Sequence, residues 1–206
     1  GHTYYLNLGG IANLTKVSAD GNLTAYDVCP CNQVLNQYRQ LLGQAYDDGG
    51  RLARQGQMHK EVLAYLNRES YFHQGAPKSL DNNWIIHDFM QRFPKANAID
   101  VLHTYTNWMS TCIASEVDGD LEHTSMMCTG GGTHNLYAIE LLRSHLVEKG
   151  CILHIPSTEI IDFKEAILMA LLAKHYVLDT PNVLRNVTGA TIDTIGGALY
   201  KAPPSV

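Results

Sequence analysis

The sequence has no long apolar run and no excess of positive charge, and each absence excludes a class of protein. No stretch approaches the roughly 20 apolar residues that a membrane-spanning helix needs, and no signal peptide is visible at the start. Fifteen lysine and arginine residues stand against 20 aspartate and glutamate residues, which gives a net charge of −5. This balance argues against nucleic acid or an anionic membrane as the main partner.

The sequence also lacks the spacings of a disulfide framework or a zinc site. Its five cysteines are an odd number spread over a chain of 206 residues, which favours a reducing compartment such as the cytoplasm. The ten histidines are scattered, without HExxH or a paired Cys/His spacing. We therefore expect no protein-built metal site.

What is present is a pattern of short strands followed by helices. Residues 3–8, 11–18 and 22–28 are rich in β-forming residues, and Asp20-Gly21 is a strong hairpin signal between the second and third. Because tight turns join these three strands, the sequence predicts an antiparallel meander.

The rest of the chain predicts alternating helices and strands. A helix is expected to begin at Pro30 and stop at Gly43, and another to run over 98–116, with a helical insertion at about 46–96. Strands follow at 126–129 and 151–155, and a last helix opens at Asp162, with its apolar run 166–173 buried. A meander followed by β and α elements predicts an α/β fold, a five-stranded mixed sheet with helices on both faces.

A glycine run lies between the predicted strand 126–129 and the helix expected to begin near Thr133. Gly130, Gly131 and Gly132 would leave backbone N–H groups bare at the helix N-terminus, where a phosphate or a ring edge can approach closely. A plain tight turn accounts for the same glycines, and both interpretations stay open.

Seven segments of the sequence match the motifs of one family in the same order. They are Leu6–Asn13, Tyr26–Asn32, Tyr46–Gly56, Pro77–Ser79, Thr129–Asn135, Glu165–Ala173 and Val187–Ala190. Together they resemble the second domain of the anhydro-N-acetylmuramic acid kinases, which carries motifs such as N-[IL]-G-G-I-A-N and C-G-G-G-A-H-N.

The resemblance implies a ribonuclease H-like domain, one half of the actin-like ATPase fold of sugar kinases. It implies that residues 1–206 form a single such half-domain and that the first domain of the family has no counterpart in this chain. It also implies ATP and Mg²⁺ as cofactors and an anhydro sugar as substrate, whose bridge is opened by water before phosphorylation.

Two acids take catalytic roles by the same resemblance. Asp27 matches the base that removes a proton from the attacking water, as in inverting glycoside hydrolysis, and Glu165 matches a second acid near the sugar. Helix or turn capping explains both equally simply: Asp27 precedes a helix, and Asp162-x-x-Glu165 has the spacing of a capping box.

The remaining site residues are also implied by resemblance. Gly9, Gly10 and Asn13 would border the β- and γ-phosphates of ATP, although Gly9-Gly10 can equally be an ordinary hairpin turn. Gly130, Gly131, Gly132 and Asn135 would flank the adenine and ribose. Lys78 and Ser79 would edge the sugar site, or belong to a solvated loop.

One segment departs from the family pattern. Cys29 and Cys31 stand where the family has glycines, and Val28 replaces a threonine. Side chains at glycine positions could obstruct a substrate. Alternatively, a thiol at a helix N-terminus could have a lowered pKa and a redox role.

The sequence therefore predicts the ATP- and sugar-facing domain of a cytoplasmic sugar kinase, with a homodimer as a further expectation from the family. The alternative is a non-catalytic or chaperone-like nucleotide-binding module of the same fold. A third option is a truncated domain that binds nothing by itself.

Overall fold

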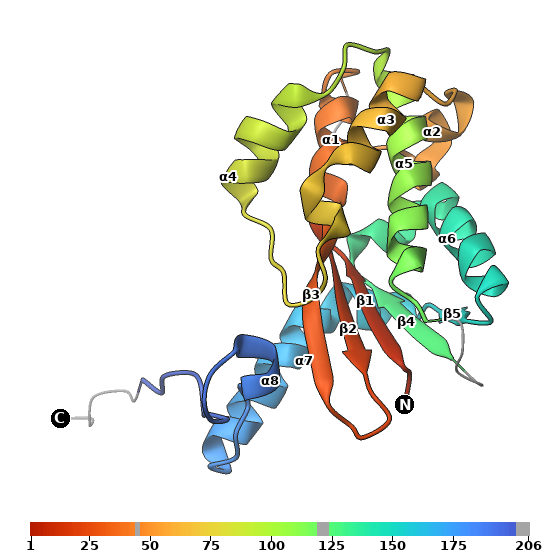
Figure 1. The fold of residues 1–206 in the computed structure, drawn as a ribbon. Helices are drawn as coiled ribbons and strands as arrows, with labels where there is room; N and C mark the ends of the chain where they lie inside the picture. The colour runs from red at the N-terminus through yellow and green to blue at the C-terminus, as the bar shows by residue number, and fades with distance from the viewer. Residues whose placement is uncertain (44–45, 119–123, 201–206) are drawn as a thin grey trace. The chain divides into compact units, whose positions relative to one another are not determined.

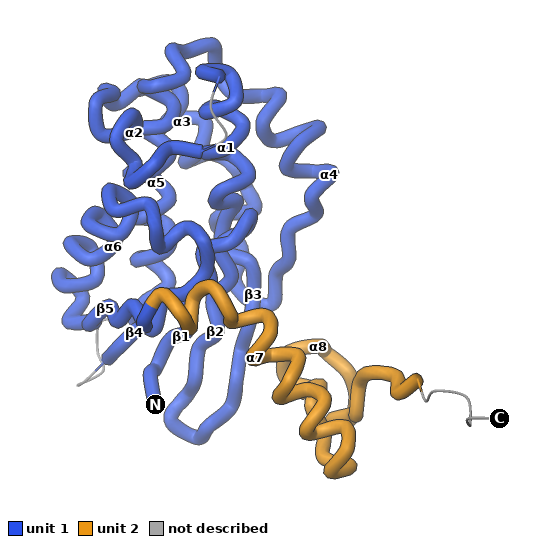
Figure 2. The backbone as a smooth tube through the Cα atoms, turned by 180° about the vertical axis from the view of Figure 1, so that it is seen from behind, with its two compact units in different colours: residues 1–157 blue, residues 158–206 orange. Residues whose placement is uncertain are grey.

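The computed structural model describes residues 1–43, 46–118 and 124–200. The chain divides into two compact units, Gly1–Ser157 and Thr158–Val206, which are coloured separately in Figure 2. Each unit is described by itself.

Unit 1 is built on one five-stranded sheet (Figure 1). Its strands are β1 (Tyr4–Leu8), β2 (Ile11–Val17), β3 (Leu23–Pro30), β4 (Ser125–Thr129) and β5 (Ile152–His154), in the order β3-β2-β1-β4-β5. The first three form the antiparallel meander, and β4 and β5 join it in parallel. The predicted five-stranded mixed sheet with its antiparallel meander is therefore confirmed.

Two long helices and a set of short ones complete unit 1. The helix over 98–116 is confirmed as α5 (Ala98–Ser115), which packs against the second long helix, α6 (Leu136–Glu148). The first helix, α1 (Asn32–Gln40), begins after Pro30 rather than at it, because Pro30 ends β3. The short elements are η1 (Asp48–Gly50), α2 (Arg51–Gln55), α3 (Lys60–Arg68), η2 (Ser70–His73), α4 (Asn82–Trp84), η3 (Ile85–Phe89), η4 (Met90–Arg92) and η5 (Gly131–His134).

The core of unit 1 lies on one face of the sheet. Alternate residues of β1 (Tyr4, Leu6 and Leu8) are at most 1% exposed, whereas Tyr5 on the opposite face is 39% exposed. This is the period of two that a strand imposes when only one of its faces is covered by packed helices. Helices on both faces therefore remain a prediction for this sheet.

Unit 2 contains α7 (Thr158–Val177) and α8 (Arg185–Thr188). Two expectations about α7 are wrong: it begins at Thr158 rather than Asp162, and none of its residues is buried. Apolar residues such as Phe163 and Met169 are 62% and 64% exposed. The physical reason is size, because so short a unit cannot surround a helix that is apolar on all sides. In the part of the chain that the structure describes, no helix has the length and apolarity to cross a bilayer.

The close crossing of α2 and α5 generates a prediction at Gly56. A Cβ there would press on the Ile99 carbonyl oxygen and come within 2.8 Å of the His103 Cβ. We expect Gly56→Ala to lower the free energy of unfolding by about 1–3 kcal/mol, the usual cost of overpacking. Gly75→Ala is the control, since its Cβ would meet nothing within 4 Å. Equal urea midpoints for the two variants would contradict the described packing.

Candidate active site

A row of polar side chains crosses four neighbouring strands on the face of the sheet opposite the core. The register pairs Thr129 with Asn7, Asn7 with Asn13, and Asn13 with Asp27. All four residues are half-buried, so they are neither in the core nor fully in water. The Asn7 amide donates to the Asn13 Oδ1 at 3.2 Å, and the Asn13 amide in turn donates to the Asp27 Oδ1.

The Asp27 carboxylate is held from two sides. Its Oδ1 accepts from the Asn13 amide, and its Oδ2 accepts from the Leu80 backbone N–H at 2.8 Å and the Ser79 hydroxyl at 3.2 Å. A carboxylate offers about four acceptor positions. These three donors therefore fix its orientation and leave capacity for one more, such as a water O–H.

A β-bulge adjoins Asp27. Asn13 pairs with Asp27 but Ala12 pairs with Cys29, so Val28 is the extra residue of β3. Bulges bend a strand and redirect its side chains, and they occur often beside active sites. The backbone at Asp27 is also tied to other segments: its N–H donates to the Lys78 carbonyl, and its carbonyl accepts from the Tyr71 hydroxyl. Asp27 is not the cap of α1, because that position belongs to Cys31.

The two residues predicted to edge the sugar site lie in different surroundings. Ser79 is exposed and its hydroxyl contacts Asp27. The side chain of Lys78 is 2% exposed, and its ammonium group pairs with Glu116. This burial does not support a direct contact between Lys78 and a ligand.

The Gly9-Gly10 turn closes the hairpin of β1 and β2 and also caps α1. The backbone N–H groups of Cys31 and Gln33 donate to the Gly10 carbonyl, and that of Asn32 donates to the Gly9 carbonyl. These are the first N–H groups of the helix, which would otherwise lack partners. The turn therefore has a structural role that is independent of any ligand.

The glycine turn after β4 allows the chain to pass very close to β1. Gly130 has a φ of +92°, and a Cβ there would lie 2.6 Å from the Asn7 Oδ1. At Gly132, a Cβ would lie 2.6 Å from the Leu8 Cβ. Glycine is needed at both positions for close approach. The α-helix does not begin at Thr133 as expected, since η5 intervenes and α6 begins at Leu136.

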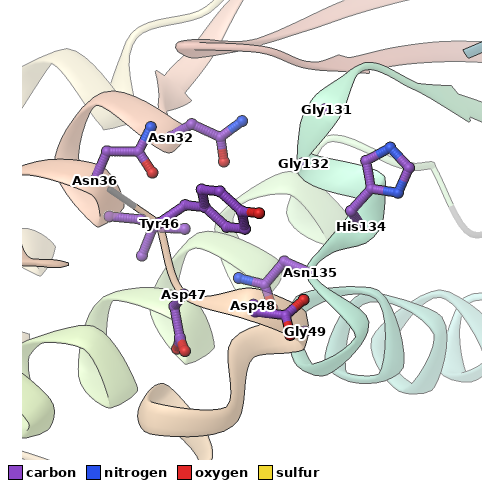
Figure 3. A pocket seen from close by; sticks show the side chains of 11 residues that line it. Asn32, Asn36, Tyr46, Asp47, Asp48, Gly49, Gly131, Gly132, His134 and Asn135 are labelled. Carbon is purple, nitrogen blue, oxygen red and sulfur yellow. The ribbon is translucent and has the colours of Figure 1, made fainter. Parts of the chain in front are cut away.

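A pocket of about 460 Å³ opens beside this turn. Figure 3 shows the Tyr46 side chain between the amides of Asn32 and Asn36 on one side and Asn135 on the other. The volume is in the range of small-molecule and cofactor sites. The lining residues are Asn32, Leu35, Asn36, Tyr46, Asp47, Asp48, Gly49, Gly131, Gly132, His134 and Asn135.

Hydrogen bonds fix the walls of the pocket. The Asp47 carboxylate accepts from the N–H groups of Leu52 and Ala53, at 3.0 and 2.9 Å, at the start of α2. Arg39 donates to the Tyr46 carbonyl. Asn135, predicted to contact a nucleotide, is the N-cap of α6 and accepts from the Ala138 N–H at 3.1 Å. Backbone and side-chain hydrogen bonds thus hold Tyr46, Asp47 and Asn135 in place around the pocket.

The pocket and the Asp27 carboxylate belong to one connected structure. Gly130 approaches Asn7, and Asn7 leads through Asn13 to Asp27. Asn32, the first residue of α1, lines the pocket, and its side-chain amide donates to the Leu8 carbonyl at 3.4 Å. The structure therefore brings Gly9, Gly10, Asn13, Asp27, Ser79, Gly130, Gly131, Gly132 and Asn135 to one edge of the sheet.

Glu165 belongs to unit 2 rather than to unit 1. It lies on α7 in unit 2, and its side chain is 81% exposed with the Lys164 ammonium at 3.8 Å. The capping-box interpretation of Glu165 is wrong, because α7 begins seven positions earlier, at Thr158.

The two cysteines at family glycine positions point into the core. Cys29 and Cys31 are 0% and 1% exposed, so neither thiol occupies the polar face that carries Asp27. Burial raises the pKa of Cys31 to about 12 and also raises the pKa of Cys29. The predicted alternative of a thiol with a lowered pKa is therefore wrong, because desolvation opposes the thiolate.

Several site residues escaped the sequence prediction. Asn7, Tyr46 and Asp47 lie inside the matched segments, yet nothing in their spacing showed a role. Leu80 contributes through its backbone N–H, which no sequence pattern reveals. A usable signal was the pair of asparagines that flank the first hairpin turn, Asn7 and Asn13, because polar side chains at directly paired positions can bond across strands.

The described residues contain no group of three or more His, Cys, Asp or Glu side chains arranged to hold a metal ion. A Mg²⁺ ion that arrives with a nucleotide needs less, since phosphates, waters and one or two carboxylates suffice.

Comparison of the whole chain with known proteins identifies a family. The anhydro-N-acetylmuramic acid kinase family matches residues 1–202. The chain belongs to this family. Among curated anhydro-N-acetylmuramic acid kinases, it is 32% identical to those of Burkholderia ambifaria and Hahella chejuensis, over 94% and 96% of its length. It is 28% identical to that of Bacillus cereus over 96% of its length.

The chain spans about half the length of these kinases, covering 54% to 55% of each. Among solved structures, the activator of 2-hydroxyisocaproyl-CoA dehydratase from Clostridium difficile, with bound ADPNP, matches with a TM-score of 0.46 and 13% identity, over 76% of this chain and 54% of that one. Family membership confirms the resemblance found in the motifs.

Proposed function

We propose that this chain is the part of an ATP-dependent anhydro-N-acetylmuramic acid kinase that carries its catalytic base and a nucleotide pocket. The observation that carries the proposal is the Asp27 carboxylate, which is oriented by three donors, keeps one acceptor position, and is linked through Asn13 and Asn7 to the Gly130 turn. Family membership supplies the substrate class.

In this proposal Asp27 takes a proton from the water that attacks the anomeric carbon of the anhydro sugar. The bridging C–O bond breaks, and the freed oxygen takes the γ-phosphoryl group of ATP. A base must lie within hydrogen-bond reach of that water, in a fixed orientation. The donors from Asn13, Ser79 and Leu80 supply the orientation without filling the carboxylate. The exposed Ser79 hydroxyl, beside the base, is proposed to contact the sugar. Glu165 stays a proposed second acid.

The amide-lined pocket is proposed to bind the adenine and ribose of ATP. The Tyr46 ring offers an aromatic face, and the side chains of Asn32, Asn36 and Asn135 offer donors and acceptors for ring edges. Gly9, Gly10 and Asn13 are proposed to face the phosphates, where positioning and charge stabilisation carry most of phosphoryl transfer. A Mg²⁺ ion bound with ATP would neutralise phosphate charge during the transfer.

If Asp27 is the base, a variant that lacks its carboxylate should bind ATP but not convert the sugar. In the full-length protein with ATP, Mg²⁺ and the anhydro sugar, we expect Asp27→Asn to lower kcat by at least about 10²-fold, because general base catalysis typically contributes that much. ATP affinity, measured by calorimetry, should change little. Asp20→Asn is the control, as that carboxylate lies in the exposed hairpin turn. Full turnover by Asp27→Asn would contradict the role of Asp27 as the base.

If the pocket binds ATP, a variant that fills it should lose ATP affinity. A Cβ at Gly131 would meet nothing within 4 Å, yet Gly131 lines the pocket. We expect Gly131→Leu to fill the pocket and weaken ATP binding at least about tenfold, since a blocked site loses its ligand contacts. The melting temperature without ligand should match that of Gly75→Leu, a control outside the pocket with the same open surroundings. Wild-type ATP affinity in Gly131→Leu would place the nucleotide elsewhere.

The alternative function is a non-catalytic or chaperone-like nucleotide-binding module. The burial of Cys29 and Cys31 removes one reason for it, because the substituted side chains do not obstruct the polar face. ATP binding by the full-length protein without any phosphorylated sugar would favour this alternative. A cytoplasmic location and a homodimer belong to the proposal as expectations from the family.

A further inference from the structure

The Lys78 ammonium group lies in a cage formed by the side chains of Glu116, Tyr26 and Tyr71. Its Nζ is 3.3 Å from the Glu116 Oε1, and it lies 5.7 Å and 5.4 Å from the ring centres of Tyr26 and Tyr71. The Tyr26 hydroxyl donates to the other oxygen of Glu116 at 2.9 Å. The Lys78 ammonium group is thus stabilised by a charge-assisted hydrogen bond to Glu116 and by the ring faces of Tyr26 and Tyr71.

Lys78 and Tyr71 each form a hydrogen bond with the backbone of Asp27. The Lys78 carbonyl accepts from the Asp27 N–H, and the Tyr71 hydroxyl donates to the Asp27 carbonyl at 2.8 Å. The next two residues after Lys78 supply both donors of the Asp27 Oδ2. Residues 78–80 orient the Asp27 carboxylate, and the ion pair between Lys78 and Glu116 links this segment to the C-terminal end of α5.

The two phenol groups beside Lys78 are partly buried, and this raises their pKa values. Burial, and then the neighbouring Glu116 carboxylate, raise the pKa of Tyr26 far above its usual value. Burial, followed by the charge of Asp27, does the same for the pKa of Tyr71. Both phenols remain neutral donors at neutral pH. A lysine in such surroundings depends on its carboxylate partner, since an unpaired buried charge is strongly destabilising.

We propose that Lys78 is a positioning residue: its buried pair with Glu116 anchors residues 78–80 and so holds the Asp27 carboxylate in its reactive orientation. The importance of that orientation rests on the proposed function, but the anchoring does not. This assigns Lys78 a role in the reaction without any contact to sugar or phosphate.

The anchoring is tested by amide hydrogen exchange, followed by NMR, on the described chain. Exchange of the Leu80 N–H reports its bond to Asp27, and the Ile139 N–H in α6 is the internal reference for global opening. We expect Lys78→Met to speed Leu80 exchange at least about tenfold relative to Ile139, since local opening follows loss of the anchor. Glu116→Gln, a milder change, should act in the same direction if Lys78→Met fails to fold.

Lys16→Met is the matched control. Lys16 also pairs with a carboxylate, Asp118, and lies 5.8 Å from the ring centre of Tyr4, but its side chain is 32% exposed. It should leave Leu80 exchange unchanged. Combining Lys78→Met with Glu116→Gln should add little to either alone, because both changes break one pair. Unchanged Leu80 exchange in Lys78→Met, or additive effects, would overturn the anchor.

Turnover of the full-length protein separates this proposal from the proposed function. We expect Lys78→Met to lower kcat at least about tenfold while KM for ATP stays constant, because a misplaced base affects the chemical step alone. A lower kcat with unchanged Leu80 exchange would mean that Lys78 acts directly, which overturns the positioning role. Faster Leu80 exchange with unchanged kcat would confirm the anchor and contradict Asp27 as the base.

Discussion

The organisation of this domain depends on the hydrogen bonds that converge on the Asp27 carboxylate. One donor comes from the neighbouring strand, through Asn13, and two come from residues more than fifty positions later, Ser79 and Leu80. A carboxylate in a half-buried position needs such donors, since desolvation without them is costly. The same three bonds leave one acceptor position of the carboxylate open, so its structural requirement is compatible with its proposed chemical role.

The second constraint is the close passage of the Gly130 turn over β1. Because glycine lacks a Cβ, the turn lies against Asn7 and Leu8, and the pocket forms where the chain leaves this crossing. Asn7 then connects the turn to Asn13 and Asp27 through cross-strand pairs. The proposed nucleotide pocket and the proposed base therefore lie along one edge of the sheet in unit 1.

Local patterns in the sequence predicted much of the fold. Asp20-Gly21 fixed the second hairpin, the apolar spacing gave α5, and the glycine run marked the turn after β4. Contacts between distant segments were not predictable. The burial of Lys78 depends on Glu116, the orientation of Cys29 depends on a bulge at Val28, and the Leu80 donor is a backbone group. The start of α7 was misplaced because Asp162-x-x-Glu165 has a capping spacing inside a helix that begins earlier.

The most direct test is to observe the hydrogen bond on Asp27 itself. In the isotope-labelled chain, NMR can detect scalar coupling across a hydrogen bond, here between the Leu80 amide nitrogen and the Asp27 carboxylate carbon. The account predicts a detectable coupling that Asp27→Ala abolishes, as for any well-aligned, charge-assisted bond of 2.8 Å. Absence of the coupling in wild type, while backbone couplings in α6 are seen, would contradict the account.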